Sequence, residues 1–263
     1  PRDPGDVWVV APDGQRYWGR FGAAGLLARD PSRGVLLQHR VSWSHHGGTW
    51  ALPGGARHQG ESARDAALRE SAEEAGVPAA SLRPRFMSVL DLDIWSYATL
   101  MADVVTPFDP VISDQESVEL AWVAPEDVVS LPLHPAFAQS WQRLRPLLGI
   151  RPALVVDAAN VMGTVPDGWW KDRAAAAERI LESLAGHARS GFPAAALGLG
   201  EDLWYPDITV VLEGRARTAR ETDGVEIIRA EGSGDDAVAA AVRRLEAEGH
   251  TVSVATSDRA LAD

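Results

Sequence analysis

The chain has 263 residues, enough for two domains that each bury a core of their own. It contains no cysteine, which excludes disulfides and thiolate metal sites, so a metal ion needs oxygen or imidazole ligands. The formal net charge of −12 argues against a long duplex-binding face, because lysine and arginine supply phosphate contacts.

Membrane and export signals are not visible in the sequence. No apolar stretch approaches the roughly 18 residues that span a bilayer. The first ten residues, PRDPGDVWVV, contain neither a basic nor an apolar segment. We therefore expect a soluble, cytoplasmic protein without a membrane partner.

The first half of the chain predicts an α/β domain. Residues 17–40 alternate turn residues with apolar runs, AAGLLAR, DPSRG and VLLQHR, and predict a β-hairpin. A helix is expected at 63–75, because Ser62 and Asp65 have the spacing of a capping box and Gly76 is a stop signal. The remaining expected elements are strands at 49–52, 86–92, 94–105 and 118–123 and an amphipathic helix at 135–148.

From Leu154 onward, strands and helices alternate, which indicates a mainly parallel sheet in a three-layer α/β domain. We place the boundary at 149–152 and expect domains at 1–150 and 151–263. The expected strands are 153–157, 195–200, 208–214, 225–230 and 251–258, and the expected helices are 171–188 and 235–249.

Three acidic residues mark the predicted helix at 63–75. Glu70, Glu73 and Glu74 are spaced i, i+3 and i+4, so their carboxylates share one helical face and repel one another. A hard divalent cation resolves that repulsion, and Mg²⁺ prefers carboxylate oxygens together with substrate phosphates. Gly54 and Gly55 allow the preceding backbone to turn sharply toward the same place.

Residues 55–77 resemble the MutT/Nudix box. Its fixed places are filled by Gly55, Glu61, Arg69, Glu70, Glu73, Glu74, Gly76 and Val77. Ser71 departs from the box, since an aliphatic residue is usual there, and we expect looser packing beneath the helix. The resemblance covers residues 15–148 and implies a mixed sheet sandwiched between helices and a hydrolase that cleaves a nucleoside diphosphate derivative. The alternative is a solvated acidic helix.

The resemblance also implies roles for individual residues. Gly55, Glu70, Glu73 and Glu74 are expected to hold Mg²⁺ or Mn²⁺, and the ion makes a bound water acidic enough to attack phosphorus. Arg69, Glu70 and Glu74 are the expected catalytic residues, with Arg69 orienting a box glutamate. Either Glu70 or a carboxylate outside the box takes the proton of the water. We also assign Arg40 and Glu61 to substrate binding.

Several polar and aromatic residues have two interpretations. Members of the family often add an acid from a later loop, and Asp114, Glu116 and Glu119 are candidates here, although each also fits an ordinary solvated acid. His45 and His46 meet a phosphate or lie in solvent. Trp95 and Tyr97 stack on a base or pack in the core.

The second half places acids where strands end. Asp157, Asp235, Asp236 and Asp258 follow strands or begin a helix, and the carboxyl ends of parallel strands meet at one edge of a sheet. Converging acids again predict a divalent ion. Helix capping is the alternative explanation for each acid on its own.

These motifs resemble the NYN division of PIN-like nucleases, over residues 153–263. The resemblance implies a Rossmann-like fold that cleaves RNA, with the four aspartates as metal ligands and Asn160 positioning a phosphate or water. Glu213 stands where an aspartate is common, which leaves the metal geometry open. Arg215, Arg217 and Arg220 offer a basic patch for single-stranded RNA. The sequence stops at Asp263, where the resemblance implies a further helix and edge strand, so we expect either a trimmed chain or an incomplete sheet.

Three functions fit these observations. The first is a Mg²⁺-dependent Nudix pyrophosphohydrolase with a PIN-like domain that binds or cleaves RNA. The second is a metal-dependent ribonuclease whose Nudix half recognises a nucleotide or an RNA 5′ end. The third is a non-catalytic nucleotide sensor, because a fold does not fix a function.

Overall fold

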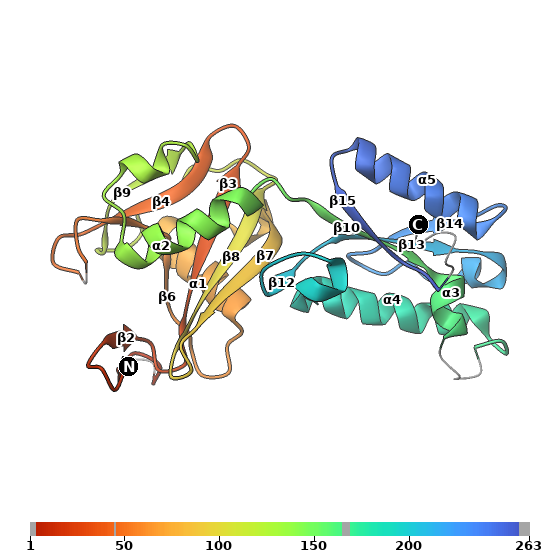
Figure 1. Cartoon of the computed structure of the whole chain (residues 1–263), viewed down its shortest axis with the longest axis horizontal. Coiled ribbons are helices and arrows are strands. Elements are labelled where there is room, and N and C mark those ends of the chain that lie inside the picture. Colours follow the sequence, from red (N-terminus) through yellow and green to blue (C-terminus); the bar gives the residue numbers. More distant parts are fainter. Residues whose placement is uncertain (1–3, 45, 165–168, 258–263) are drawn as a thin grey trace. The chain divides into compact units, whose positions relative to one another are not determined.

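The structure is a computed structural model and describes residues 4–44, 46–164 and 169–257. The chain divides after Gly149 into two compact units, Pro1–Gly149 and Ile150–Asp263 (Figure 1). Within the described ranges, no helix has the length and apolar character needed to cross a membrane.

The first unit is built on a mixed sheet with the strand order β7-β8-β3-β4-β5. Strands β3 and β8 run parallel, whereas β3–β4, β4–β5 and β7–β8 are antiparallel. Two more strands extend it, because β6 pairs with β3 and β9 pairs with β4. The bounds are β3 (Ala23–Asp30), β4 (Gly34–Arg40), β5 (Trp50–Ala51), β6 (Gly54–Ala56), β7 (Leu82–Asp91), β8 (Ser96–Val104) and β9 (Ser117–Val123).

The predicted hairpin at 17–40 is confirmed for β3 and β4, which pair through Arg29↔Val35 and Asp30↔Gly34. Asp30 holds the turn, since its Oδ1 accepts hydrogen bonds from the amides of Ser32 and Arg33. The start of that predicted segment lies instead in a separate hairpin of β1 (Trp8–Val10) and β2 (Arg16–Trp18).

Helices α1 (Ala63–Ala75) and α2 (Pro135–Leu144) cover opposite faces of the sheet (Figure 1). The predicted caps of α1 are confirmed: the Ser62 side chain accepts from the Asp65 amide, and Gly76 ends the helix in the left-handed conformation. Helix α2 buries Phe137, Trp141 and Leu144, and a 3₁₀ turn at Arg145–Leu147 replaces the last part of the helix expected to Leu148. Pro146 accounts for that change, because proline lacks the amide proton that an α-helix needs.

The second unit is a parallel sheet with the order β14-β13-β10-β15, as the alternating pattern predicted. Figure 1 shows α4 on one side of it and α5 on the other. The α5 side is closed by a core that includes Val155, Val211, Val238 and Leu245. The bounds are β10 (Pro152–Asp157), β13 (Asp207–Leu212), β14 (Glu226–Arg229), β15 (Thr251–Ala255), α4 (Arg173–Ser190) and α5 (Gly234–Ala247).

Two elements of the second unit differ from expectation. The strand predicted at 195–200 is wrong, because Ala194–Leu197 forms a 3₁₀ helix that ends at Gly198 in the left-handed conformation. A short helix, α3 (Ala158–Gly163), follows β10 directly and was not predicted. The other short elements are β11 (Phe192–Pro193), β12 (Leu203–Trp204) and 3₁₀ turns at Ala79–Ser81, Val128–Ser130 and Gly214–Thr218.

Candidate active site

Glu74 lies at the centre of the acidic group on α1. It is only 8% exposed, and its Oε2 accepts a hydrogen bond of 2.8 Å from the amide of Gly54. Burial, opposed by the Gly54 hydrogen bond and assisted by the negative charges of Glu70, Asp114 and Glu116, raises the pKa of Glu74 to about 8. A buried carboxylate in such surroundings favours a bound cation.

Glu70 lies directly against Gly55. A methyl group built on Gly55 would come within 2.6 Å of the Glu70 Oε2 atom, so only glycine leaves room for this carboxylate. Burial raises the pKa of Glu70 as well, while Arg69 lowers it in part. Gly55 and Glu70, both predicted from sequence as metal ligands, are therefore direct neighbours.

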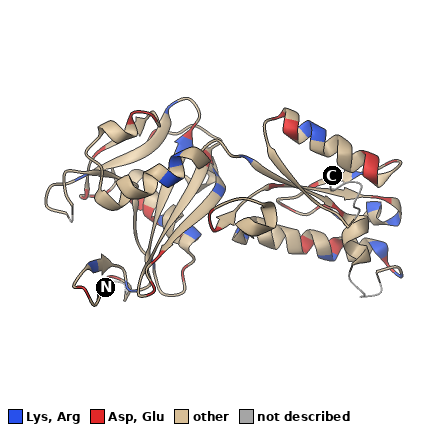
Figure 2. Cartoon of the chain, viewed as in Figure 1, with Lys and Arg blue, Asp and Glu red and all other residues tan. Residues whose placement is uncertain are grey.

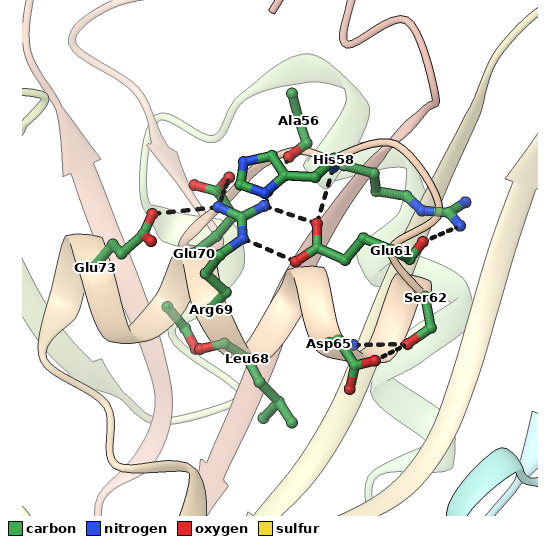
Figure 3. Close-up of polar contacts among 11 residues, drawn as sticks. Ala56, His58, Glu61, Ser62, Asp65, Leu68, Arg69, Glu70 and Glu73 are labelled. Atoms are coloured by element: carbon green, nitrogen blue, oxygen red, sulfur yellow. Dashed lines mark hydrogen bonds and ion pairs between the residues drawn. The ribbon is translucent and has the colours of Figure 1, made fainter. Parts of the chain in front are cut away.

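Arg69 joins the loop before α1 to the acids on the helix (Figure 3). Its Nε and Nη2 atoms donate to the two carboxylate oxygens of Glu61 over 2.8 and 2.9 Å. Its Nη1 atom donates to Glu70 over 2.6 Å and to Glu73 over 3.2 Å. This bidentate ion pair with Arg69 lowers the pKa of Glu61 to about 2. Arg69 is thus placed to orient Glu70.

Glu73 and Glu61 take different positions around this arginine. The Glu73 side chain is 60% exposed, and Figure 3 shows it pointing toward Arg69 from the next turn. Glu61, assigned from sequence to substrate binding, accepts from the His58 amide as well as from Arg69. In this geometry Glu61 holds the loop, and its assignment to the substrate stays a prediction.

A loop beyond β8 brings two further acids to Glu74. One carboxylate oxygen from each of Glu74, Asp114 and Glu116 lies within 4.8 Å of the other two, a group suited to a metal ion. The loop docks on the end of α1, because the amides of Val111 and Ser113 donate to the carbonyls of Ala75 and Glu74. Those carbonyls lack partners inside the helix, so the loop also completes the helix end.

Of the three later acids considered from sequence, Asp114 and Glu116 reach Glu74. Glu119 lies on β9 opposite His39 and is exposed, outside that group. Which of these acids reaches Glu74 depends on the path of the loop, and the spacing of acids in the sequence does not predict that path. Gln38 and Ser117, which hydrogen-bond in series to Asp114, were not identified from sequence, since a buried glutamine in a strand has no distinctive pattern.

Arg40, Trp95 and Tyr97, the other residues considered for substrate binding, contact neighbouring parts of the first unit. Arg40 is half-buried at the end of β4, and its amide donates to Thr49. Trp95 stacks on Tyr17 at 4.8 Å and donates to the Trp18 carbonyl, so its half-buried ring packs against β2. Burial, together with the charge of Glu74, raises the pKa of the Tyr97 phenol well above its usual range.

The structure also shows the surroundings of Ser71 and His46, two polar residues noted in the sequence of the first unit. Ser71 is fully buried, and its hydroxyl donates to the Leu68 carbonyl, so the polar group that departs from the Nudix box has a partner. The His46 ring meets the His134 ring edge to face at 4.7 Å. His45 lies outside the described residues.

The acids predicted as metal ligands in the second unit differ in burial and in hydrogen-bond partners. Asp157 is buried at the end of β10, where it caps α3 and accepts from the Asn160 side chain. Ser257 donates to the Asn160 Oδ1 atom over 2.7 Å, which ties the region after β15 to the same edge. Glu213 accepts from the Gly234 amide, whereas Asp235 and Asp236 are exposed on the first turn of α5.

These positions leave the second metal site as a prediction. Asp258 lies outside the described residues. Among the described residues, no group of three close metal-ligating side chains includes Asp157, Asp235 or Asp236. Asp157 is engaged in helix capping, the alternative considered from sequence.

The basic patch considered for the second unit is mixed in charge. Arg215, Arg217 and Arg220 are all exposed, and Arg220 pairs with Glu178 at 3.1 Å. Figure 2 shows Lys and Arg interspersed with Asp and Glu on the helices of this unit.

Comparisons with known proteins agree with the geometry of the first unit. The NUDIX domain profile matches residues 19–144. A Mycobacterium tuberculosis protein named putative 8-oxo-dGTP diphosphatase 3 is 52% identical over 154 residues, covering 55% of this chain and 70% of that protein. The CTP pyrophosphohydrolase of Escherichia coli is 29% identical, covering 49% of this chain and 94% of that protein.

A solved structure shares both sequence and fold. The crystal structure of RenU, a Nudix hydrolase from M. smegmatis, is 49% identical, with a TM-score of 0.50, and covers 54% of this chain and 94% of that one. The chain therefore belongs to the Nudix family, and it is a hydrolase that acts on phosphoric anhydrides. The residues that match the NUDIX profile lie in the first unit.

Proposed function

We propose that the first unit is a nucleoside triphosphate pyrophosphohydrolase that uses Mg²⁺ or Mn²⁺. The observation that carries this proposal is the meeting of Glu74 with Asp114 and Glu116, beside Glu70 and the Gly54–Gly55 turn. The residues fit a hard divalent ion, because all are oxygen donors and a buried acid among other acids needs a positive counter-charge.

Each residue has a distinct part in this proposal. Glu70, Glu73 and Glu74 would hold the ion together with the loop acids and the Gly55 carbonyl. When bound, the ion neutralises diphosphate charge and acidifies water. Arg69 holds Glu70 in place through its 2.6 Å hydrogen bond, and Glu61 in turn fixes Arg69. Glu70 or one of the loop acids accepts the proton as water attacks phosphorus and the anhydride bond breaks.

The names of the relatives suggest the first substrates to test. The mycobacterial relative is named for 8-oxo-dGTP and the E. coli relative for CTP. We therefore place a nucleoside triphosphate, including one with an oxidised purine, ahead of other diphosphate derivatives.

A substrate panel tests this function. Phosphate and pyrophosphate release would be measured for 8-oxo-dGTP, dGTP and CTP, and release of the two product nucleotides for dinucleotides, in Mg²⁺, in Mn²⁺ and with a chelator. We expect metal-dependent release, and a loss of more than about 100-fold in Glu74→Gln and Glu73→Gln, because ligands and their supports set metal affinity. Glu126→Gln is the control, since Glu126 is an exposed acid outside the group. Turnover indifferent to both changes in the box would contradict the assignment.

We further propose that the second unit is a PIN-like domain that binds or cleaves single-stranded RNA. Supporting observations are its parallel sheet, the Asp157–Asn160–Ser257 contacts at the carboxyl ends of the strands, and the exposed Asp235 and Asp236 on the first turn of α5. Cleavage of labelled RNA in Mn²⁺ should disappear in Asp236→Asn and survive Glu74→Gln. If neither binding nor cleavage of RNA occurs, the proposal fails.

A further inference from the structure

Asp114 is supplied by a loop, so its carboxylate needs a support that α1 does not provide. The backbone of the loop is fixed at both ends: Ser113 donates to the Glu74 carbonyl, and the Glu116 carbonyl accepts from the Val41 amide. These bonds bring Asp114 near Glu74, but they leave its side chain free to rotate away from two neighbouring negative charges. Something must hold the carboxylate against that repulsion.

Ser117, the first residue of β9, provides a hydrogen bond to this carboxylate. Its Oγ atom donates to the Asp114 Oδ1 atom over 2.9 Å. A hydroxyl has a single proton and can direct it elsewhere, so the donor itself must be oriented. Ser117 is only 8% exposed, which limits the orienting partners to protein groups.

Gln38 orients the hydroxyl. This residue lies on β4 and is fully buried, and its Nε2 atom donates to the Ser117 Oγ atom over 2.7 Å. Because the amide fills an acceptor position of the hydroxyl, the Ser117 proton is directed to Asp114. The three residues thus form a directed series from the sheet to the acidic group.

The cost of burying Gln38 supports this reading. Its Oε1 atom is buried and, within the described chain, accepts no hydrogen bond. An unpaired buried carbonyl oxygen destabilises a fold, and an apolar side chain of similar size avoids that penalty. The amide donor therefore accounts for glutamine at this position better than packing does.

We propose that Gln38 and Ser117 are positioning residues that hold Asp114 in the direction required to bind the divalent ion. The inference rests on the proposed metal site of the first unit. Outer partners that orient a metal ligand commonly change metal affinity by about 10- to 100-fold when they are removed. The series explains how an acid in a loop becomes a reliable ligand.

Mn²⁺ binding to the full chain tests the proposal without turnover. Free Mn²⁺ would be measured by its paramagnetic resonance signal, and Glu74→Gln identifies the sites that belong to the first unit. We expect Ser117→Ala and Gln38→Leu each to weaken binding at those sites about 10-fold. Neither change should weaken binding further in an Asp114→Ala background, because both act through Asp114.

Two further variants separate positioning from a general effect on the fold. Ser88→Ala removes another buried serine, one that accepts from Arg143 of α2, and should leave Mn²⁺ affinity unchanged. Ser117→Thr retains the hydroxyl and should restore affinity. Melting curves show whether each variant folds. If Gln38→Leu does not fold, Ser117→Ala alone tests the proposal.

The outcomes are distinct. If Asp114→Ala weakens Mn²⁺ binding while Ser117→Ala and Gln38→Leu bind like the unaltered chain, the positioning role is wrong and the metal site stands. If Glu74→Gln and Asp114→Ala also bind like the unaltered chain, the proposed metal site itself fails. Additive losses in the Asp114→Ala background would likewise overturn the series.

Discussion

Glu74 combines burial with a negative environment, and that combination links pH to the stability of the first unit. In the metal-free chain its pKa is about 8, above the ordinary value of 4.5 for glutamate. Below pH 4.5 the carboxyl is protonated in both folded and unfolded states, so it carries no penalty. As pH rises toward 8, the unfolded chain releases the proton while the folded chain keeps it, and folding stability falls.

This linkage predicts how Glu74→Gln changes the free energy of unfolding in metal-free, chelator-containing buffer. We expect the variant and the unaltered chain to have similar unfolding free energies near pH 4.5, and the variant to be the more stable at pH 8 to 9. Urea unfolding at a series of pH values checks this. A constant difference across that range would show that Glu74 does not titrate with a raised pKa.

Gly55 is the second residue whose chemistry can be tested alone. A methyl group there meets the flexible end of Glu70 at 2.6 Å, not the backbone. Gly55→Ala should therefore fold while displacing the Glu70 carboxylate, and hydrolase activity should fall about 10-fold or more by analogy with other disturbed metal supports. Gly149→Ala is the matched control, because nothing lies within 4 Å of that position. Full activity in folded Gly55→Ala protein would argue against a fixed position for Glu70.

At the scale of elements, α1 was the most predictable part of the chain. Ser62, Asp65 and Gly76 are local signals, and both ends of the helix fall where those residues place them. The hairpin of β3 and β4 was predictable for the same reason, since its turn is held by Asp30 within three residues. Such helix caps and turns can be predicted because the residues that form their hydrogen bonds are close in sequence.

Elements without local signals were harder to predict. Strand β6 begins with Gly54 and Gly55, residues that disfavour strands, and exists because β3 pairs with it. The apolar run AALGLG suggested a strand, yet the alanines favour a helical turn and Gly198 ends it. The Asp114 and Glu116 positions depend on a loop that docks across the sheet, so tertiary contacts decide which acids join the site.

The C-terminal end of α1 offers a prediction about an element. Gly76 has a φ of 63°, a conformation that costs other residues about 1–2 kcal/mol. Gly76→Ala should lower the free energy of unfolding by about 1–2 kcal/mol. It should also weaken divalent metal binding, because the loop that carries Asp114 docks on the last carbonyls of this helix.

Urea unfolding and Mn²⁺ titration of the same sample check both parts. Gly149→Ala again serves as the control, since its φ is not positive. A loss of stability with unchanged Mn²⁺ affinity would show that the loop position does not depend on the helix cap.

At the scale of the whole molecule, the chain joins two units whose main sheets differ in construction. One is a mixed sheet that carries the Nudix match, and the other is a parallel sheet. The proposed hydrolase residues, from Gln38 to Ser117, all lie in the first unit. The chemistry proposed for that unit therefore needs no side chain from the second.

This separation predicts that residues 1–149 alone retain hydrolase activity. We expect kcat/KM for the preferred triphosphate within about 3-fold of the full chain, a difference of less than 1 kcal/mol in transition-state stabilisation. Circular dichroism and melting establish that the fragment folds, and Asp236→Asn in the full chain should show the same unchanged kcat/KM. A folded but inactive fragment would show that the second unit contributes to the reaction, either through a residue at the site or by fixing the strands that carry it.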